Sequence, residues 1–309
     1  MRHGIVWLLY IGLTLSELGL LVPAPAVAQS IVALKSRDLE PFNQALAGFV
    51  ASCDSRITEY DLQGSERRTR GILKRIVADK PKLVIAIGPL AAQVVKEEVR
   101  DVPVVFLMVS HPHKYSLKGD NIVGISLDIP IETQFTTYKS LIPSLKTIGV
   151  IYDPERTGEL VTESKGVAER LGLTLLASAV NSQKGVPAAL RSMLGRIDAL
   201  WMVPDETVVT PEAFEFLLLA AFENHLPFLA ASDIFVEVGA FASLSPDYAD
   251  VGRQACQLVR DIESGRLQLT KVNVVPPAKV NLAINLKTAS KIGVTLSSEV
   301  VQSASKVYR

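Results

Sequence analysis

The chain has 309 residues, of which 48% are hydrophobic, so it can bury one large core or two of ordinary domain size. Lysine and arginine together number 32, and so do aspartate and glutamate. This balance excludes a strong overall field that would attract nucleic acid or anionic lipid, so nucleic acid is not expected as a partner.

The first 28 residues have the pattern of a secretory signal peptide. A short basic start precedes a mostly apolar run over 4–22, and Ala26 to Ala28 end the segment in the small-x-small pattern that signal peptidase accepts. An uncleaved anchor helix is the alternative, because the apolar run nearly reaches the length of a membrane span. Glu17 within the run favours cleavage. We expect an exported, periplasmic protein that begins at Gln29.

Apolar runs alternate with helical patterns over the first part of the mature chain. The expected strands are 31–34, 56–61, 83–87, 102–109 and 122–127, and the expected helices are 40–51, 65–79 and 90–99. The continuous apolar runs at 83–87 and 102–109 are typical of strands covered on both faces. Strands that alternate with helices predict a parallel sheet with right-handed crossovers.

The stretch 121–135 divides the chain. It begins as an apolar strand and is expected to become a helix around Asp128 to Glu132, with Pro130 in the first turn. The same alternation then starts again. The expected strands are 147–152, 174–180, 199–203 and 227–230, and the expected helices are 159–171, 186–194 and 211–224. The sequence therefore predicts two α/β lobes that are joined at this stretch.

The C-terminal part is expected to visit both lobes. We expect 240–244 to recross the hinge, 247–263 to form a helix, and 272–275 and 280–284 to form late strands, with a peripheral tail after Thr295. The predicted first lobe comprises 31–126 and 246–270. The predicted second lobe comprises 127–245 and 271–309.

Ligands of open parallel sheets bind beyond the carboxyl ends of the strands. Gly88 allows a ligand to approach the amides of the next helix, which suits an anion, although a tight turn with nothing bound explains this glycine more simply. Asp205 and Asp233 follow expected strands and suit a cationic group of a ligand. Helix capping is an equal alternative for Asp205 and the favoured one for Asp233.

Signatures of catalysis are missing from the sequence. It has no Gly-x-Ser-x-Gly, no Walker lysine loop, no His-Glu-x-x-His and no Rossmann glycine triplet after the first strand. His111 and His113 are not completed into a metal site by further ligands at a recognised spacing. We therefore expect no enzyme activity, no metal and no cofactor.

Six segments, taken in their order and spacing, resemble one family over nearly the whole mature chain. They are 121–134, 148–154, 199–205, 239–243, 247–255 and 282–289. The family is that of the ABC-transporter periplasmic substrate-binding proteins, which includes the tryptophan- and tyrosine-type binding components.

The resemblance implies an α/β fold of the type-I periplasmic-binding-protein kind. It has two Rossmann-like lobes with parallel sheets flanked by helices, joined by a three-segment hinge, and a small-molecule ligand closed between the lobes. The implied partners are an ABC permease and an ATPase in the membrane, and a monomer is expected. A sensor-input protein for a receptor kinase is the first alternative, and a secreted hydrolase is the second.

The resemblance also carries ligand-facing positions onto this chain. They are Gly88, Leu90, Ala91, Ser110, Tyr152, Asp153, Asp205, Thr207, Ser232 and Asp233, and Ser36 in the first loop is a further candidate. Relatives often have His-Pro where this chain has Arg37-Asp38, and a hydroxyl where it has Leu90. We therefore expect a small polar ligand that Asp205 contacts, and rank free aromatic amino acids below other small solutes.

Cys53 and Cys256 are the two cysteines of the chain. In an exported protein they can form one disulfide, and two separate buried thiols fit the sequence equally well. In the fold that the resemblance implies, both would pack on one face of the first sheet. We hypothesise a disulfide within lobe one.

Overall fold

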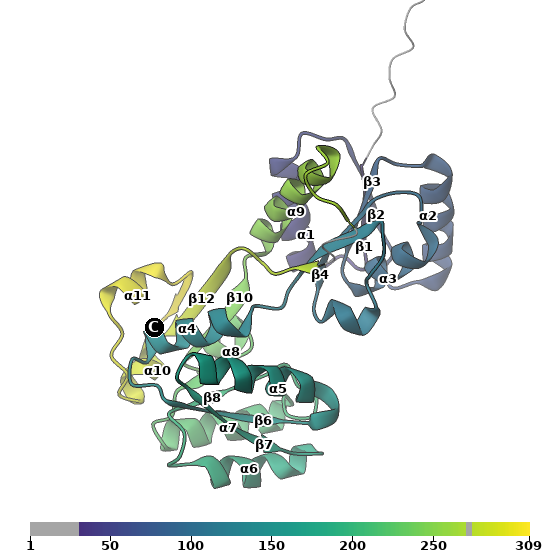
Figure 1. Cartoon of the computed structure of the whole chain (residues 1–309). Helices are drawn as coiled ribbons and strands as arrows, with labels where there is room; N and C mark the ends of the chain where they lie inside the picture. The colour runs from purple at the N-terminus through teal and green to yellow at the C-terminus, as the bar shows by residue number, and fades with distance from the viewer. Residues whose placement is uncertain (1–30, 270–273) are drawn as a thin grey trace, which may run out of the picture.

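The computed structural model describes residues 31–269 and 274–309, so the expected signal peptide and residues 272–273 lie outside the described residues. The described residues form one sheet of six strands and one of seven, each flanked by helices on both faces (Figure 1). The predicted fold class, two α/β lobes with mainly parallel sheets, is confirmed.

Lobe one contains the first sheet, whose strand order is β11-β5-β4-β3-β1-β2 and whose described pairings are all parallel. Its strands are β1 (Ile31–Lys35), β2 (Ile57–Asp61), β3 (Leu83–Ile87), β4 (Val104–Val109), β5 (Ile122–Ser126) and β11 (Val274–Val275). Its helices are α1 (Glu40–Ser52), α2 (Glu66–Asp79), α3 (Pro89–Glu98) and α9 (Tyr248–Glu263), with the 3-10 turn η1 (Pro112–Tyr115). Every residue of β3 and β4 is buried, because α1 and α9 cover one face of the sheet and α2 and α3 cover the other.

Helices α1 and α9 lie in backbone contact, although some 200 residues separate them in the sequence (Figure 1). A Cβ atom on Gly48 would overlap the carbonyl oxygen of Ala249, and one on Gly252 would overlap that of Ala45. Only glycine permits so close an approach at these two positions. The contact assigns α9, a late element of the chain, to lobe one.

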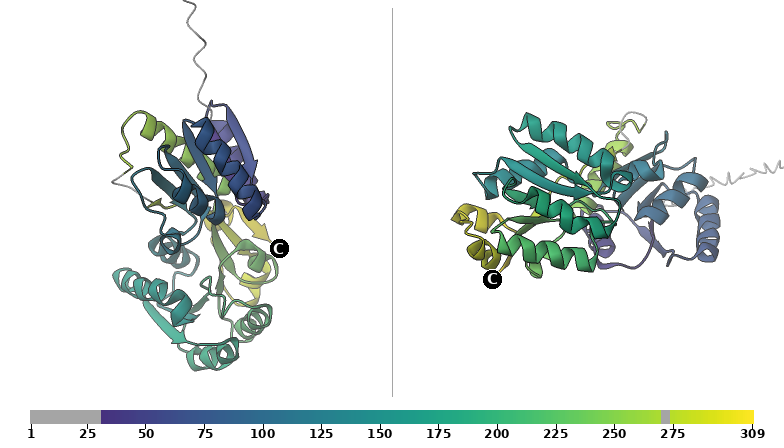
Figure 2. Two further views of the ribbon diagram at one scale, coloured as in Figure 1. Left: turned by 90° about the vertical axis from the view of Figure 1, so that its right-hand side faces the viewer. Right: turned by 90° about the horizontal axis from the view of Figure 1, so that it is seen from below.

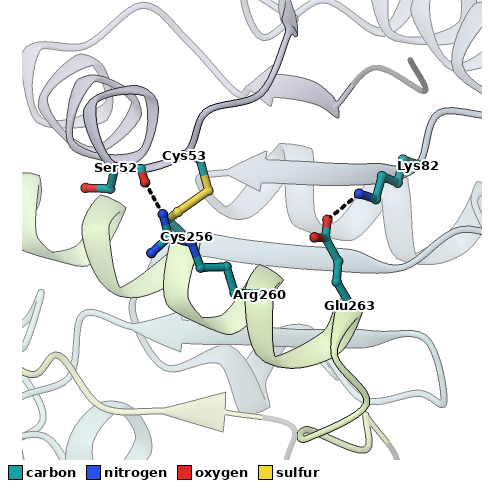
Figure 3. The surroundings of a disulfide bond; sticks show 6 residues. All are labelled: Ser52, Cys53, Lys82, Cys256, Arg260 and Glu263. Carbon is teal, nitrogen blue, oxygen red and sulfur yellow. Dashed lines mark hydrogen bonds and ion pairs between the residues drawn. A yellow bond between two sulfur atoms is a disulfide. The ribbon is translucent and has the colours of Figure 1, made fainter. Parts of the chain in front are cut away.

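A disulfide joins the same two helices (Figure 3). Cys53 directly follows α1 and Cys256 lies in α9, with 5.6 Å between their Cα atoms. The guanidinium of Arg260 also donates to the carbonyl of Ser52. The hypothesis of a disulfide within lobe one is confirmed, and the alternative of two separate thiols is wrong.

Lobe two contains the second sheet, whose strand order is β13-β12-β10-β9-β8-β6-β7. Its strands are β6 (Thr147–Tyr152), β7 (Thr174–Ala179), β8 (Ala199–Trp201), β9 (Phe228–Ala230), β10 (Ala242–Pro246), β12 (Val280–Asn285) and β13 (Lys306–Tyr308). Its helices are α4 (Ile131–Leu141), α5 (Pro154–Arg170), α6 (Val186–Met193), α7 (Pro211–Glu223), α8 (Asp233–Glu237), α10 (Leu286–Lys291) and α11 (Ser298–Ser303), with the 3-10 turn η2 (Gln183–Gly185). The β10–β12 pair is antiparallel and the other described pairs are parallel.

Several elements differ from the sequence prediction. The segment 240–244 does not recross the hinge, because β10 pairs with β9 and β12 inside the second sheet. The strand β11 pairs with β5 in the first sheet, whereas the predicted partition placed all residues from 271 onward in lobe two. The tail is not wholly peripheral, since β13 extends the second sheet beside β12. Pro130 has an extended ψ of 134° and precedes α4 instead of lying in its first turn.

The chain passes between the two sheets three times, as the three-segment hinge requires. The first crossing runs from β5 to α4, the second from β10 to α9, and the third from β11 to β12. Figure 2 shows the lobes as two bodies connected by these thin segments. None of the helices in the described part of the chain combines the length and apolar character needed to cross a membrane.

Replacement of both cysteines, Cys53→Ala with Cys256→Ala, should destabilise lobe one by about 2–5 kcal/mol, because the bridge restricts the unfolded chain. Urea unfolding of the double variant measures this loss. A thiol titration of the denatured, unreduced wild-type protein should find no free thiol, and two titrating thiols would contradict the bridge.

Candidate functional site

A pocket of about 590 Å³ lies between the two lobes beside the first hinge crossing. Lobe one contributes residues 111 and 113–114 after β4, the crossing contributes 128–131, and lobe two contributes 154–160 and 163 from the start of α5. These segments follow the carboxyl ends of strands β4, β5 and β6. The position is the one that open parallel sheets use for ligands.

Side chains of both signs line this pocket. The ammonium group of Lys114 reaches across from lobe one and donates to the carbonyl oxygen of Arg156 at 3.4 Å. The Asp128 carboxylate receives the backbone amide of His111 at 2.9 and 3.1 Å and lies 2.9 Å from its ring Nδ1. The ring of His113 stacks on that of His111. Both histidines therefore belong to the wall of a polar pocket.

Asp205 forms the centre of a buried network in lobe two. The residue is 1% exposed, and its Oδ2 atom accepts from the amide of Asp153 at 2.8 Å and the hydroxyl of Thr157 at 2.6 Å. Its Oδ1 atom accepts from the amides of Thr207 and Val208 at 3.0 and 3.3 Å. Four donors of the protein thus occupy the carboxylate. It joins the loop after β6 to the loop after β8 and does not face the pocket.

Asp153 and Thr207 extend this network. The hydroxyl of Thr207 donates to the Asp153 carboxylate at 2.7 Å, and the same carboxylate caps α5 by accepting from the amide of Glu155 at 3.0 Å. These two hydrogen bonds hold the pKa of Asp153 below its usual value. The stabilisation that the ionised group supplies is therefore present above the ordinary aspartate pKa and is lost as the pH falls through the lowered pKa.

The first turn of α5 is bent where it meets the network. Thr157 has φ −128° and ψ 16°, which interrupts the helix after one turn. Its hydroxyl is the group that donates to the buried Asp205 carboxylate. The bend separates the turn that carries Glu155 and Arg156 from the rest of α5, and residues on both sides of the bend line the pocket.

The loop after β3 in lobe one offers less to an anion than the sequence predicts. Pro89 has no amide hydrogen, and the amide of Ala91 donates to the hydroxyl of Ser36 at 2.9 Å. Gly88 has a φ of 91°, and a Cβ atom there would lie 2.7 Å from Ser36 and from the Phe42 ring. Gly88 is thus explained by a tight turn, and Leu90 carries the remaining amide of the first turn of α3.

The other predicted residues are dispersed. Ser110 is exposed at the end of β4, and Tyr152 is half-buried at the end of β6. Ser232 precedes α8, and Asp233 forms an ion pair with Lys306 of β13. The predicted capping role of Asp233 is therefore wrong, because its carboxylate bonds to a lysine and Ser232 occupies the capping position.

None of the predicted site residues lines the inter-lobe pocket, but their neighbours do. His111 follows Ser110, and Pro154 follows Asp153. The sequence pointed to Tyr152 and Asp153 at the end of β6, whereas the pocket is lined by the residues 154–160 that follow them. His111 and His113 were considered for a metal site. In the described ranges, no three histidine, cysteine, aspartate or glutamate side chains gather so that they could hold a metal ion.

Two α/β lobes, three crossings and a pocket between the lobes define a ligand-binding protein with the type-I periplasmic-binding-protein fold. Residues 51–308 match the sequence model of the family described as ABC transporter substrate binding protein, and the chain belongs to this family. The family is one of binding proteins and not of enzymes.

One curated protein and two solved structures are similar to this chain. A protein named tyrosine-binding protein from Clostridioides difficile is 25% identical over 227 residues, which cover 71% of this chain and 65% of that protein's length. The ABC domain from Streptococcus pneumoniae in complex with L-Trp is 26% identical and covers 90% of this chain and 99% of that one, with a TM-score of 0.58. The ligand-free, open structure of a substrate binding protein with adhesive properties from Clostridium difficile is 21% identical, with coverages of 91% and 99% and a TM-score of 0.76.

The buried position of Asp205 leads to a prediction about stability. Asp205→Asn replaces one acceptor oxygen with an amide that has only donors to face, so we expect a loss of about 1–3 kcal/mol in the free energy of unfolding. Urea unfolding measures it. Glu206→Gln is the matched control, because the neighbouring Glu206 side chain is 86% exposed and should leave stability unchanged. Equal stability of both variants would show that the network does not support the fold.

Proposed function

We propose that this chain is the extracytoplasmic solute-binding component of an ABC import system. It binds a small polar solute between its lobes, closes on it and delivers it to a membrane permease that an ATPase drives. The observation that carries the proposal is the pocket that both lobes and the first hinge crossing line together. A solute held there touches both moving bodies, so its binding energy favours the closed arrangement.

The disulfide supports export. Disulfides persist in oxidising compartments such as the periplasm and are rare in the reducing cytosol. The bond between Cys53 and Cys256 therefore fits a protein that crosses the membrane and loses residues 1–28. The intact mass of the periplasmic product should correspond to a chain that starts at Gln29. A product that keeps its N-terminus in the membrane fraction would contradict this proposal.

Two observations outside the pocket lining guide the choice of solute class: the named relatives and the first turn of α3. The relatives named for tyrosine and found with L-Trp support amino acids as the first class to examine. In this chain, however, the turn at Gly88 offers an α-carboxylate the amide of Leu90, because Pro89 has none and Ala91 already donates to Ser36. We therefore propose a small polar solute whose recognition does not depend on a carboxylate at α3, and rank free aromatic amino acids lower.

Calorimetry with tryptophan, tyrosine and phenylalanine should detect no submicromolar binding to the wild-type protein. Leu90→Thr returns a hydroxyl to the first turn of α3 and should tighten binding of these amino acids about ten- to hundredfold, the equivalent of about 1–3 kcal/mol. Val94→Thr, one turn further along the same helix, is the control and should change nothing. Submicromolar wild-type binding, or no gain in Leu90→Thr, would refute this account of the carboxylate.

Closure gives the test of the proposed function as a whole. Mass spectrometry of the purified periplasmic protein should identify a co-purifying solute, and adding that solute to the stripped protein should reduce its radius of gyration in solution scattering. A shift of the open-to-closed ratio from 99:1 to 1:99 needs about 5.5 kcal/mol of differential binding. An unchanged radius at saturation would refute closure. Capture of a receptor kinase in place of a permease would favour the sensor alternative.

A further inference from the structure

Gln254 of α9, a helix of lobe one, forms two hydrogen bonds with the third hinge crossing. Its side-chain Nε2 atom donates to the carbonyl oxygen of Pro276 at 2.9 Å, and its Oε1 atom accepts from the backbone amide of Ala278 at 3.0 Å. A side-chain amide carries one donor and one acceptor group, as a peptide bond does, and here it bonds to the chain on both sides of Pro277. Gln254 belongs to the segment 247–255, which the ligand pocket does not use.

The segment that Gln254 binds, residues 276–278, has a rigid backbone. Pro276 and Pro277 have fixed φ angles and no amide hydrogens, and a residue that precedes proline is confined to extended conformations. The chain at this point has little freedom of its own. Because Gln254 binds the chain on both sides of Pro277, residues 276–278 are attached to lobe one as a rigid extension of α9.

The second crossing meets the third at the same place. The antiparallel β10–β12 ladder of lobe two ends at the pair Pro246 and Val280. Immediately beyond this pair, the amide of Asp247 donates to the carbonyl of Lys279 at 3.0 Å, and their side chains form an ion pair at 3.1 Å. Asp247 also caps α9. The second crossing therefore leaves lobe two at Asp247, and the third enters lobe two at Lys279.

The first crossing has a similarly short junction. Asp128 is tied to lobe one, since its carboxylate accepts the amide of His111 and its own amide donates to Ser126. The next residue, Ile129, is tied to lobe two, since its carbonyl accepts from the side chain of Gln134 at 2.9 Å. All three crossings therefore change from one lobe to the other within one or two residues.

We propose that Gln254 is the positioning residue that fixes the pivot of lobe closure. By binding residues 276–278 to α9, it confines bending of the third crossing to Lys279, opposite the bend of the second crossing at Asp247. The two crossings then act as one hinge line. The proposal rests on the proposed function in that it concerns the motion that would enclose the solute, whereas the two hydrogen bonds of Gln254 are made within the protein.

The experiment measures the hydrogen bonding of Gln254 to the crossing and the motion of the lobes, in the full mature protein without added solute. Spin labels on Arg70→Cys in α2 and Arg191→Cys in α6 report the distribution of distances between the lobes, and both positions are exposed. Gln254→Leu should broaden this distribution and make the Ala278 amide exchange about tenfold faster, because both bonds to the crossing are lost. Gln254→Glu keeps the acceptor for Ala278 but cannot donate to Pro276, so it should give a smaller broadening.

Gln257→Leu is the matched control. Gln257 lies one turn further along α9 and bonds to Asp261 of the same helix, so its loss should alter neither the distance distribution nor Ala278 exchange. Thermal unfolding of each variant separates a local effect from a general loss of stability, and Gln254→Glu serves if Gln254→Leu does not fold. A distribution in both Gln254 variants that matches the wild type would overturn the proposal. Failure to find a solute would refute the proposed function and leave this result intact.

Discussion

The contact between α1 and α9 is the constraint on which the rest of the structure depends. Gly48 and Gly252 allow the two backbones to touch, and the bridge between Cys53 and Cys256 fixes the pair covalently. Between β10 and β12 of the second sheet, the chain returns to lobe one as α9 and β11, so it crosses between the lobes twice more. Two lobes joined by one segment could move freely relative to each other, whereas three crossings restrict them to a defined hinge motion.

The two walls of the cleft use their polar groups differently. In lobe two, the Asp205 carboxylate and the hydroxyls of Thr157 and Thr207 are all engaged within the protein, so they make a rigid support. In lobe one, the Ser36 hydroxyl is engaged in the same way by Ala91. The groups that face the pocket belong to neighbouring residues, such as His113 and Arg156, which the supported loops carry. Buried polar groups of this kind must be paired, and the pairing removes them from ligand recognition.

The sequence predicted the fold far better than the site, and particular residues show why. The apolar runs of β3 and β4 and the disulfide followed from local patterns and from the resemblance to a family. The partners of Asp205 did not, because Asp153 and Thr157 lie 52 and 48 residues away and only the fold brings them together. The short strand β13 has no pattern of its own and forms because β12 offers an edge. The strand β11 was expected, but its place beside β5 in the first sheet was not, because only the fold brings these two strands together.

Pocket and hinge share residues, which relates the energy of binding to the motion. Asp128 and Ile129 line the pocket and also form the junction of the first crossing. The hydrogen bond between Lys114 and Arg156 crosses the lobes at an exposed position, and such a bond contributes about 0.5–1.5 kcal/mol. That is well below the roughly 5.5 kcal/mol that a full shift between two arrangements requires. On the proposed function, the larger part must come from a solute that touches both lobes, and a pocket that includes the junction places the solute where its contacts change as the hinge bends.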